Sequence, residues 1–121
     1  MMILEAKNNH LGTNSLLDVK LKRLFLESID ECMSTLGETV KATIIFILKR
    51  KFNINMEEVI EKPEEFVYAL RSTIGSKGSQ ILENLILMKF HSKLGLKYER
   101  SENKEFAEYI GDACRKFRNI K

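Results

Sequence analysis

The stretch from Thr73 to Leu82 reads T-I-G-S-K-G-S-Q-I-L, with two glycines three positions apart. Glycine has no Cβ atom, so its backbone can approach a ligand closely. Lys77 would face phosphate groups, and a helix beginning after Ser79 would favour an anion at its N-terminus. The candidate contacts to a nucleic acid or another anion are therefore Gly75, Ser76, Lys77 and Gly78.

The spacing I-G-x-x-G-x-x-I is also the signature loop of the K-homology RNA-binding module, which grips several nucleotides between two helices. That module needs a three-stranded sheet behind its helices, and this chain offers only L-K-Y-E, near Leu96, as a plausible strand. In the alternative, a structural turn, Gly75 ends one helix and Ser76 or Ser79 caps the next. We favour the structural turn.

A second group of candidate anion contacts is the basic run in the last turn of a predicted helix, formed by Lys49, Arg50 and Lys51. Cations at this end of a helix interact favourably with the helix dipole, and such runs are most often solvated faces. The formal net charge of +3 is modest. It permits nucleic-acid binding without indicating it.

No set of residues has the spacing of a catalytic or metal-binding constellation. His10 and His91 each lack a second ligand at metal-binding spacing, and we expect both on the surface. The nucleophile pattern G-x-S-x-G and the phosphate-binding pattern G-x-x-x-x-G-K-[ST] do not occur. Cys32 and Cys114 fall on apolar stripes and are expected to be reduced, although a disulfide between them stays open. We predict no enzyme activity and no cofactor.

The elements that position these residues are predicted to be helices. The chain has 121 residues, one proline, no tryptophan and 44% hydrophobic residues, a composition typical of one helix-rich domain. We expect a flexible tail over residues 1–14 and a single helical domain over 15–121. Helix starts are predicted from Ser15, from a capping box at Thr35–Glu38, and from Asn55, Pro63 and Ser101. Helix ends are predicted at Ser34, Asn53, Gly75 and Gly95.

The fold class that follows is all-α, a compact bundle of about five helices with orthogonal or helix-hairpin packing. Apolar residues at helical spacing favour a helix over Glu38–Phe52, although T-I-I-F-I-L, residues 43–48, could also form a strand. This helix and the one after Ser79 are predicted to form the centre. Four apolar residues lie off the main stripes and are candidate partner contacts: Leu26, Ile45, Phe46 and Leu87.

Four blocks in the middle of the chain resemble a small archaeal family, the fifth Nitrosopumilus output domain. They are L-G-E-T-V-K-A-T-I, L-K-R-K-F-N-I, E-K-P-E-E-F-V-Y-A-L and I-L-E-N-L-I-L-M-K-F-H-S-K-L-G-L, between about Leu36 and Leu96. Members of that family occur alone or at the C-terminal side of sensory modules. The resemblance implies a helical, non-catalytic output domain in signalling, and it assigns no site residues.

The function we predict is a regulatory output or adaptor domain that binds a protein partner, with a second copy as one option. The alternative is a nucleic-acid-binding regulator that uses the G-S-K-G segment and the basic helix ends. The N-terminus lacks a signal-peptide pattern, and no apolar run approaches the ~20 residues of a membrane helix. We therefore expect a cytoplasmic protein with no membrane partner.

Overall fold

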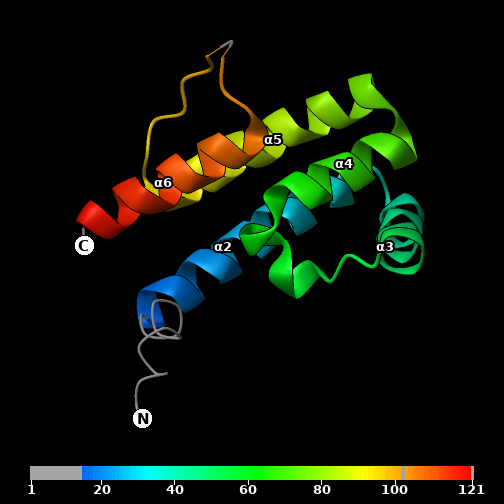
Figure 1. The fold of residues 1–121 in the computed structure, drawn as a ribbon, viewed down its shortest axis with the longest axis horizontal. Coiled ribbons are helices and arrows are strands. Elements are labelled where there is room, and N and C mark those ends of the chain that lie inside the picture. The colour runs from blue at the N-terminus through cyan, green and yellow to red at the C-terminus, as the bar shows by residue number, and fades with distance from the viewer. Residues whose placement is uncertain (1–14, 102, 121) are drawn as a thin grey trace.

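The computed structural model describes residues 15–101 and 103–120, so the predicted tail and His10 lie outside the described residues. The elements are α2 (Ser15–Ser34), α3 (Glu38–Phe52), η1 (Met56–Glu61), α4 (Pro63–Ile74), α5 (Ser76–Leu94) and α6 (Phe106–Ile120), where η1 is a 3₁₀ helix. The described residues contain no strand, which confirms the all-α prediction (Figure 1). The strand alternatives for residues 43–48 and for L-K-Y-E are therefore wrong.

The core lies between α2, α4, α5 and α6, and one phenylalanine from each of these helices joins a central aromatic cluster. The ring centroids of Phe25 and Phe90 are 5.1 Å apart, and Phe106 lies 6.3 Å from Phe25 and 6.2 Å from Phe66. All four side chains are almost fully buried. Aromatic pairs at these separations add specific geometry to the area they bury. Helix α5 packs against α2, α4 and α6 and so forms the middle of the bundle.

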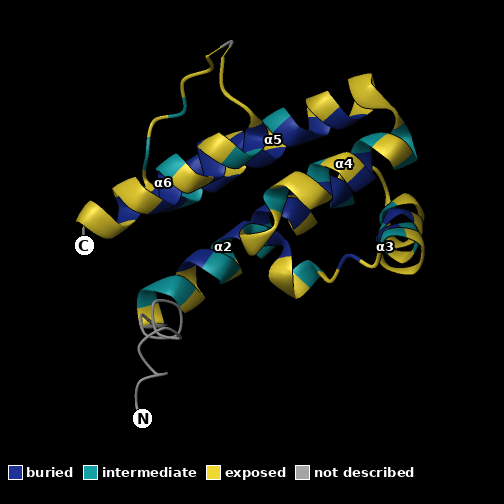
Figure 2. Ribbon diagram, in the orientation of Figure 1, coloured by how far each residue is buried: buried dark blue, intermediate teal, exposed yellow. Residues whose placement is uncertain are grey.

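Helix α3 is peripheral, which corrects the prediction that it would be central. It packs on α4 and on the end of α2, and only Ile44 and Leu48 are buried. Most of its surface is exposed (Figure 2), and Phe46 has 60% of its surface accessible. The apolar run that suggested a central helix is thus wider than the face α3 buries.

The predicted ends of α3 and α5 are confirmed in detail. Asn53 and Gly95 adopt the left-handed conformation, with φ of 57° and 73°. The residue after each cap donates its backbone N–H to the preceding turn: Ile54 to the carbonyl of Leu48, and Leu96 to that of His91. This bonding satisfies carbonyls that the helix end would otherwise leave without partners.

Two predicted serine or threonine caps are wrong, because glycines occupy the cap positions. Gly37 precedes α3 with φ of 100°, while the hydroxyl of Thr35 donates to the carbonyl of Cys32. Gly75 both ends α4 and precedes α5 with φ of 90°, and no side chain caps α5. Because glycine adopts positive φ without strain, the chain can change direction sharply at these positions without a capping hydroxyl.

His91 is buried, which corrects the expectation that it would be on the surface. The chain after Gly95 folds back so that the ring of Tyr98 lies 5.0 Å from the imidazole. Nδ1 of His91 is 2.7 Å from the carbonyl oxygen of Leu87, to which it donates when it carries the proton. Burial lowers the pKa of His91, and nearby Lys116 and Lys104 act in the same direction.

Both cysteines are free thiols inside the core, as expected for small hydrophobic side chains. Burial raises the pKa of Cys114 to about 11 and also raises the pKa of Cys32. Because the thiolate is the reactive form, neither residue has the environment of a nucleophile.

Candidate functional site

An apolar groove opens between α3 and the N-terminal half of α5. Its volume is about 270 Å³, and the end of α2 and the end of α4 close its sides. The groove exists because α3 packs on α4 and α2 and not along α5. The residues that line it are Thr35, Leu36, Val40, Ile44, Ile74, Gly78, Ile81, Leu82 and Leu85. We call this feature the α3/α5 groove.

The rims of the groove expose large apolar side chains. On the α5 side, Ile81 is 64% exposed, Leu85 42%, and Met88 on the next turn 48%. On the α3 side, Leu36 and Val40 are 43% and 47% exposed. Contiguous exposed apolar residues on a small soluble domain mark an interaction surface more often than isolated ones do.

The sequence produces this surface because α5 is apolar on two faces. Leu82, Ile86 and Phe90 point into the core, whereas Ile81, Leu85 and Met88 follow the outer face at spacings of four and three residues. Residues at these spacings share one side of a helix. The outer stripe therefore forms a ridge about two turns long. No charged residue falls between its first and last members on that face. We call it the α5 ridge.

Charge is distributed unevenly along the groove. The Met88 end lies beside the last turns of α2, where Nζ of Lys93 is 3.0 Å and Nζ of Lys89 is 3.6 Å from carboxylate oxygens of Glu31. The pKa of Glu31 is lowered, chiefly by its hydrogen bond from Lys93.

A second basic group holds the neighbouring carboxylates in place. Nζ of Lys41 lies 2.7 Å from Asp30 and 3.5 Å from Glu38, and these contacts raise the pKa of Lys41. At the opposite end of the ridge is Lys77, which is exposed and takes part in none of the ion pairs found among the described residues.

The residues predicted to contact a partner do not gather in one place. Phe46 is exposed on α3, whereas Leu26 and Ile45 are half-buried. Leu87 is 3% exposed and belongs to the core, which removes it from any surface. The sequence analysis did not single out Val40 or Leu85, which line the groove, and so missed it. The sequence does place apolar residues on both faces of α5, but it does not show which of these faces α3 leaves uncovered.

The structure also separates the two groups of candidate anion contacts. Ser76, Lys77 and Gly78 form the exposed first turn of α5 and not a loop, and Gly78 and Ile44 both line the α3/α5 groove. The basic run Lys49–Lys51 is at the other end of α3, where the ring of Phe52 meets that of Tyr68 at 6.2 Å. With a rise of about 1.5 Å per residue, the run begins roughly 8 Å beyond Ile44.

The basic run makes local contacts with aromatic rings. The guanidinium of Arg50 lies 5.5 Å from the ring centre of Phe46, and Nζ of Lys51 lies 5.9 Å from that of Phe52. Each contact joins neighbours on one helix. Nucleic-acid binding by these residues stays a prediction.

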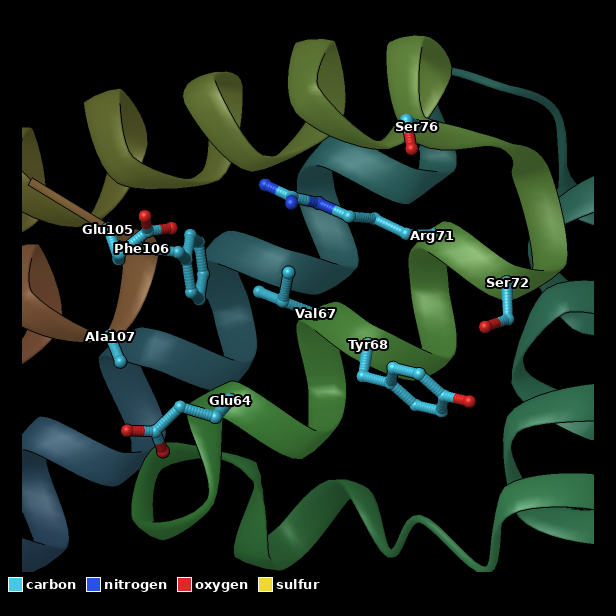
Figure 3. A pocket seen from close by; sticks show the side chains of 9 residues that line it. All are labelled: Glu64, Val67, Tyr68, Arg71, Ser72, Ser76, Glu105, Phe106 and Ala107. Carbon is cyan, nitrogen blue, oxygen red and sulfur yellow. The ribbon is translucent and has the colours of Figure 1, made fainter. Parts of the chain in front are cut away.

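A second groove, about 440 Å³ in volume, crosses α4 beside the start of α6. Figure 3 shows Arg71 extending from α4 toward Glu105 and Phe106, with Ser76 at the start of α5 nearby. Val67 and Phe106 supply its apolar surface. A polar depression of about 310 Å³ continues from it beneath residues 98–101 and shares Arg71 with it.

Arg71 is held at this place by a buried carboxylate. Nε and one terminal nitrogen of Arg71 each donate to an oxygen of Glu83 at 2.9 Å, and the hydroxyl of Ser79 donates to Glu83 at 2.6 Å. The side chain of Glu83 is only 8% exposed. A two-pronged pair of this kind fixes the geometry of two helices, here α4 and α5. Its bonds are satisfied within the fold, which favours a structural role.

Neither groove has a histidine or a cysteine in the lining that the structure describes. The described residues contain no cluster of three or more histidine, cysteine or acidic side chains able to hold a metal ion. The serines of the second groove, Ser72 and Ser76, have no histidine beside them in its lining.

Comparison with known protein families decides the classification. The family model described as Nitrosopumilus output domain 5 matches residues 20–111. The chain belongs to this family. The match extends beyond the Leu36–Leu96 region seen in the sequence and includes most of α2 and the start of α6, so the core that joins these helices is part of the family domain.

The family name describes an output domain, which is consistent with a non-catalytic role. No curated protein and no solved structure shows significant similarity to the chain. Among the described residues, no helix has both the length and the apolar character needed to cross a bilayer.

Proposed function

We propose that this Nitrosopumilus output domain is a non-catalytic signalling domain of the cytoplasm that acts by binding a protein partner. The observation that carries the proposal is the α3/α5 groove. Its two rims expose Val40, Ile81 and Leu85 toward a shared apolar depression, although the domain has a complete core elsewhere. Covering these side chains with a partner would contribute about 25 cal/mol for each Å² of apolar surface removed from water.

The groove suits an output domain because a partner can occupy it without disturbing the bundle. The four-phenylalanine core lies between α2, α4, α5 and α6, whereas the groove is bounded by the peripheral α3. A partner would therefore contact surface that is already formed. Binding surfaces of protein partners are often formed in advance in this way.

A photocrosslinking residue tests the proposal directly. The Leu85→benzoylphenylalanine variant is expressed in cells, and its crosslinked products are compared with those of Ile120→benzoylphenylalanine, another exposed apolar position but on α6. We expect protein adducts from position 85 that position 120 does not give. The purified partner should then bind the chain, and Ile81→Asp should weaken that binding at least tenfold.

The opposite result of the crosslinking experiment would contradict the proposal. If position 85 gives no protein adduct above the level at position 120, the groove contacts no protein in the cell and the proposal fails. Circular dichroism of each variant checks that the helical fold is retained.

A further inference from the structure

We infer that the second groove, which crosses α4 beside the start of α6, binds a basic amino acid such as lysine. The inference goes beyond the proposed function, because this groove shares no lining residue with the α3/α5 groove. Its volume of about 440 Å³ is that of a small-molecule site. Its charged lining groups are one cation and two carboxylates, on either side of an apolar wall.

Arg71 is oriented to receive the carboxylate of the ligand. Its Nε and one terminal nitrogen donate to Glu83 at 2.9 Å, and this pair fixes the plane of the guanidinium. The other terminal nitrogen donates to no group among the described residues. A guanidinium has five N–H donors, so one carboxylate leaves donors for a second. The side chain is 35% exposed and lines the groove, where those donors can be reached.

Glu105 supplies the partner for the ammonium group next to that carboxylate. Figure 3 shows Arg71 extending toward Glu105. The pKa of Arg71 is raised, first by its hydrogen bond to Glu83 and also by the charge of Glu105. Glu105 nevertheless forms no ion pair with Arg71 or with any other described residue. Two opposite charges that lie near each other without contact suit the adjacent carboxylate and ammonium of an amino acid.

Glu64 and the apolar wall fit the side chain of the ligand. Glu64 lies seven residues before Arg71 on α4, on the same face and about 10 Å away along the helix axis. Val67 lies between them, and Phe106 and Ala107 supply the facing apolar surface (Figure 3). The four-carbon stem of lysine would cover this wall and bring its ammonium group to Glu64. Each charged lining group then meets an opposite charge.

The charges around the groove favour a ligand with one net positive charge. Lys62 is engaged by Glu58, and Lys104 and Arg115 both bind Asp112. With the three charged lining residues and the buried glutamate included, carboxylates outnumber cations by one. The excess remains when the next charges along the chain are added, three carboxylates against two cations: Glu61, Glu65, Glu108, Lys77 and Arg100.

Titration of the isotope-labelled full chain with L-lysine, followed by amide NMR, tests the inference. We expect saturable shifts with a Kd between about 10 μM and 1 mM. The shifts should map to α4 and the start of α6, and not to the α3/α5 groove. Three analogues each lack one charge: norleucine the side-chain ammonium, Nα-acetyl-lysine the α-ammonium and lysinamide the carboxylate. Each should bind at least tenfold more weakly than lysine.

Substitutions assign each charge of the ligand to its partner. Glu64→Gln and Glu105→Gln should each weaken lysine binding at least tenfold. Glu64→Gln should leave the Kd of norleucine unchanged, and Glu105→Gln should leave that of Nα-acetyl-lysine unchanged, because the interacting charge is already missing. The control Glu38→Gln removes an exposed carboxylate on α3, outside this groove, and should bind lysine as the wild type does.

Any of three results would overturn the inference. They are the absence of saturable shifts up to about 10 mM lysine, ten times the weakest expected Kd, equal binding of lysine and its three analogues, or a loss in Glu38→Gln as large as in the groove variants. Circular dichroism checks the fold of each variant. The analogue series uses the wild-type chain and decides the outcome even if a variant misfolds.

Discussion

At the residue scale, a polar network joins α4 and α5 inside the helix packing. Glu83 lies on the inner side of α5 and accepts hydrogen bonds from Arg71 and Ser79. A carboxylate in this position is costly to bury unless it is paired and fully hydrogen-bonded. The network therefore sets the relative position of α4 and α5, and removing one member should cost more than removing the pair.

The first prediction concerns this pair. Arg71→Met alone leaves Glu83 buried without its cation, which should lower the free energy of unfolding by roughly 2–3 kcal/mol. The effect is placed below that of a fully buried pair because the Arg71 side chain is 35% exposed. The double variant Arg71→Met with Glu83→Leu should recover much of this loss. Urea unfolding of the two single variants and the double variant measures the coupling. Additive single-variant losses would contradict a paired network.

The second prediction concerns pH and His91. Its pKa is lowered from an ordinary value of 6.5, first by burial and then by nearby lysines, despite the opposing hydrogen bond to Leu87. The unfolded chain therefore binds a proton at a higher pH than the folded chain does. The stability due to neutral His91 is full above pH 6.5 and is lost as the pH falls from 6.5 through the lowered folded-state pKa.

The His91→Gln variant provides the control, because glutamine keeps a hydrogen-bond donor and does not titrate. Urea unfolding between about pH 7.5 and 5 should show a steeper loss of stability for the wild type than for this variant. The other titrating groups are the same in both proteins and contribute equally to both curves. Parallel curves would show that His91 does not carry the effect.

At the element scale, a glycine at a helix end has a different role from a glycine inside a helix. Gly75 and Gly95 have positive φ, which other residues adopt only with strain. Gly78 has ordinary helical geometry inside the first turn of α5. A Cβ atom added there would lie 3.9 Å from its nearest neighbour, Cδ1 of Ile74, an ordinary contact distance. The two glycines of the G-S-K-G segment therefore have different roles.

The third prediction contrasts Gly78 with Gly95. Gly78→Ala should stabilise the domain by about 0.5 kcal/mol, because alanine loses less freedom than glycine in a helix. Gly95→Ala should destabilise it by about 1 kcal/mol, because alanine must adopt the left-handed conformation. Thermal unfolding of the two variants compares them. A destabilised Gly78→Ala variant would show that the first turn of α5 does not have its helical form.

Helix boundaries were largely predictable from the sequence because local signals set them. Asn53, Pro63 and Gly95 act through their own backbone preferences and occupy the predicted positions. The predictions of hydroxyl caps for α3 and α5 were wrong because a nearby glycine, Gly37 or Gly75, already provides the required turn. Burial was less predictable, since it depends on which elements meet. His91 is covered by Tyr98, seven residues later, and no helical periodicity reports that contact.

The candidate site was harder to predict than the fold for the same reason. An apolar stripe shows that a helix face is buried against something, but it does not identify the covering element. Leu85 and Leu87 are both apolar residues of α5, yet one is exposed and the other is in the core. Leu85 faces the α3/α5 groove, whereas Leu87 lies on the side of α5 near Tyr98 and Tyr109, so the elements that pack on each side separate their environments.

At the scale of the whole molecule, the helices differ in how firmly they are held. Helix α5 is surrounded by α2, α4 and α6, and eight of its residues are buried, whereas α3 has two buried residues and lies at the edge. Regions with few buried apolar contacts open at a lower free energy than the core does. The domain should therefore comprise a stable four-helix core and a less stable α3.

The fourth prediction is that amide hydrogens of α3 exchange through local opening, while those in the middle of α5 exchange only through global unfolding. Native-state hydrogen exchange at increasing urea concentration distinguishes the two modes. Ile44→Ala should mainly lower the opening free energy of α3. Ile86→Ala, in the core, should lower the global value by about 2–5 kcal/mol. Equal opening free energies for α3 and α5 would contradict this hierarchy.

The same measurement connects stability with association. If a protein partner occupies the α3/α5 groove, the protection of α3 should increase with the concentration of added partner, because binding stabilises the closed form by mass action. In Leu85→Asp, protection of α3 should be low and independent of the partner's concentration, while protection of α5 stays near the global value. Since α3 forms one wall of the groove and is also its least stable element, filling the groove should order α3 first. Occupancy of the docking surface would thus change the dynamics of one helix and leave the core unchanged.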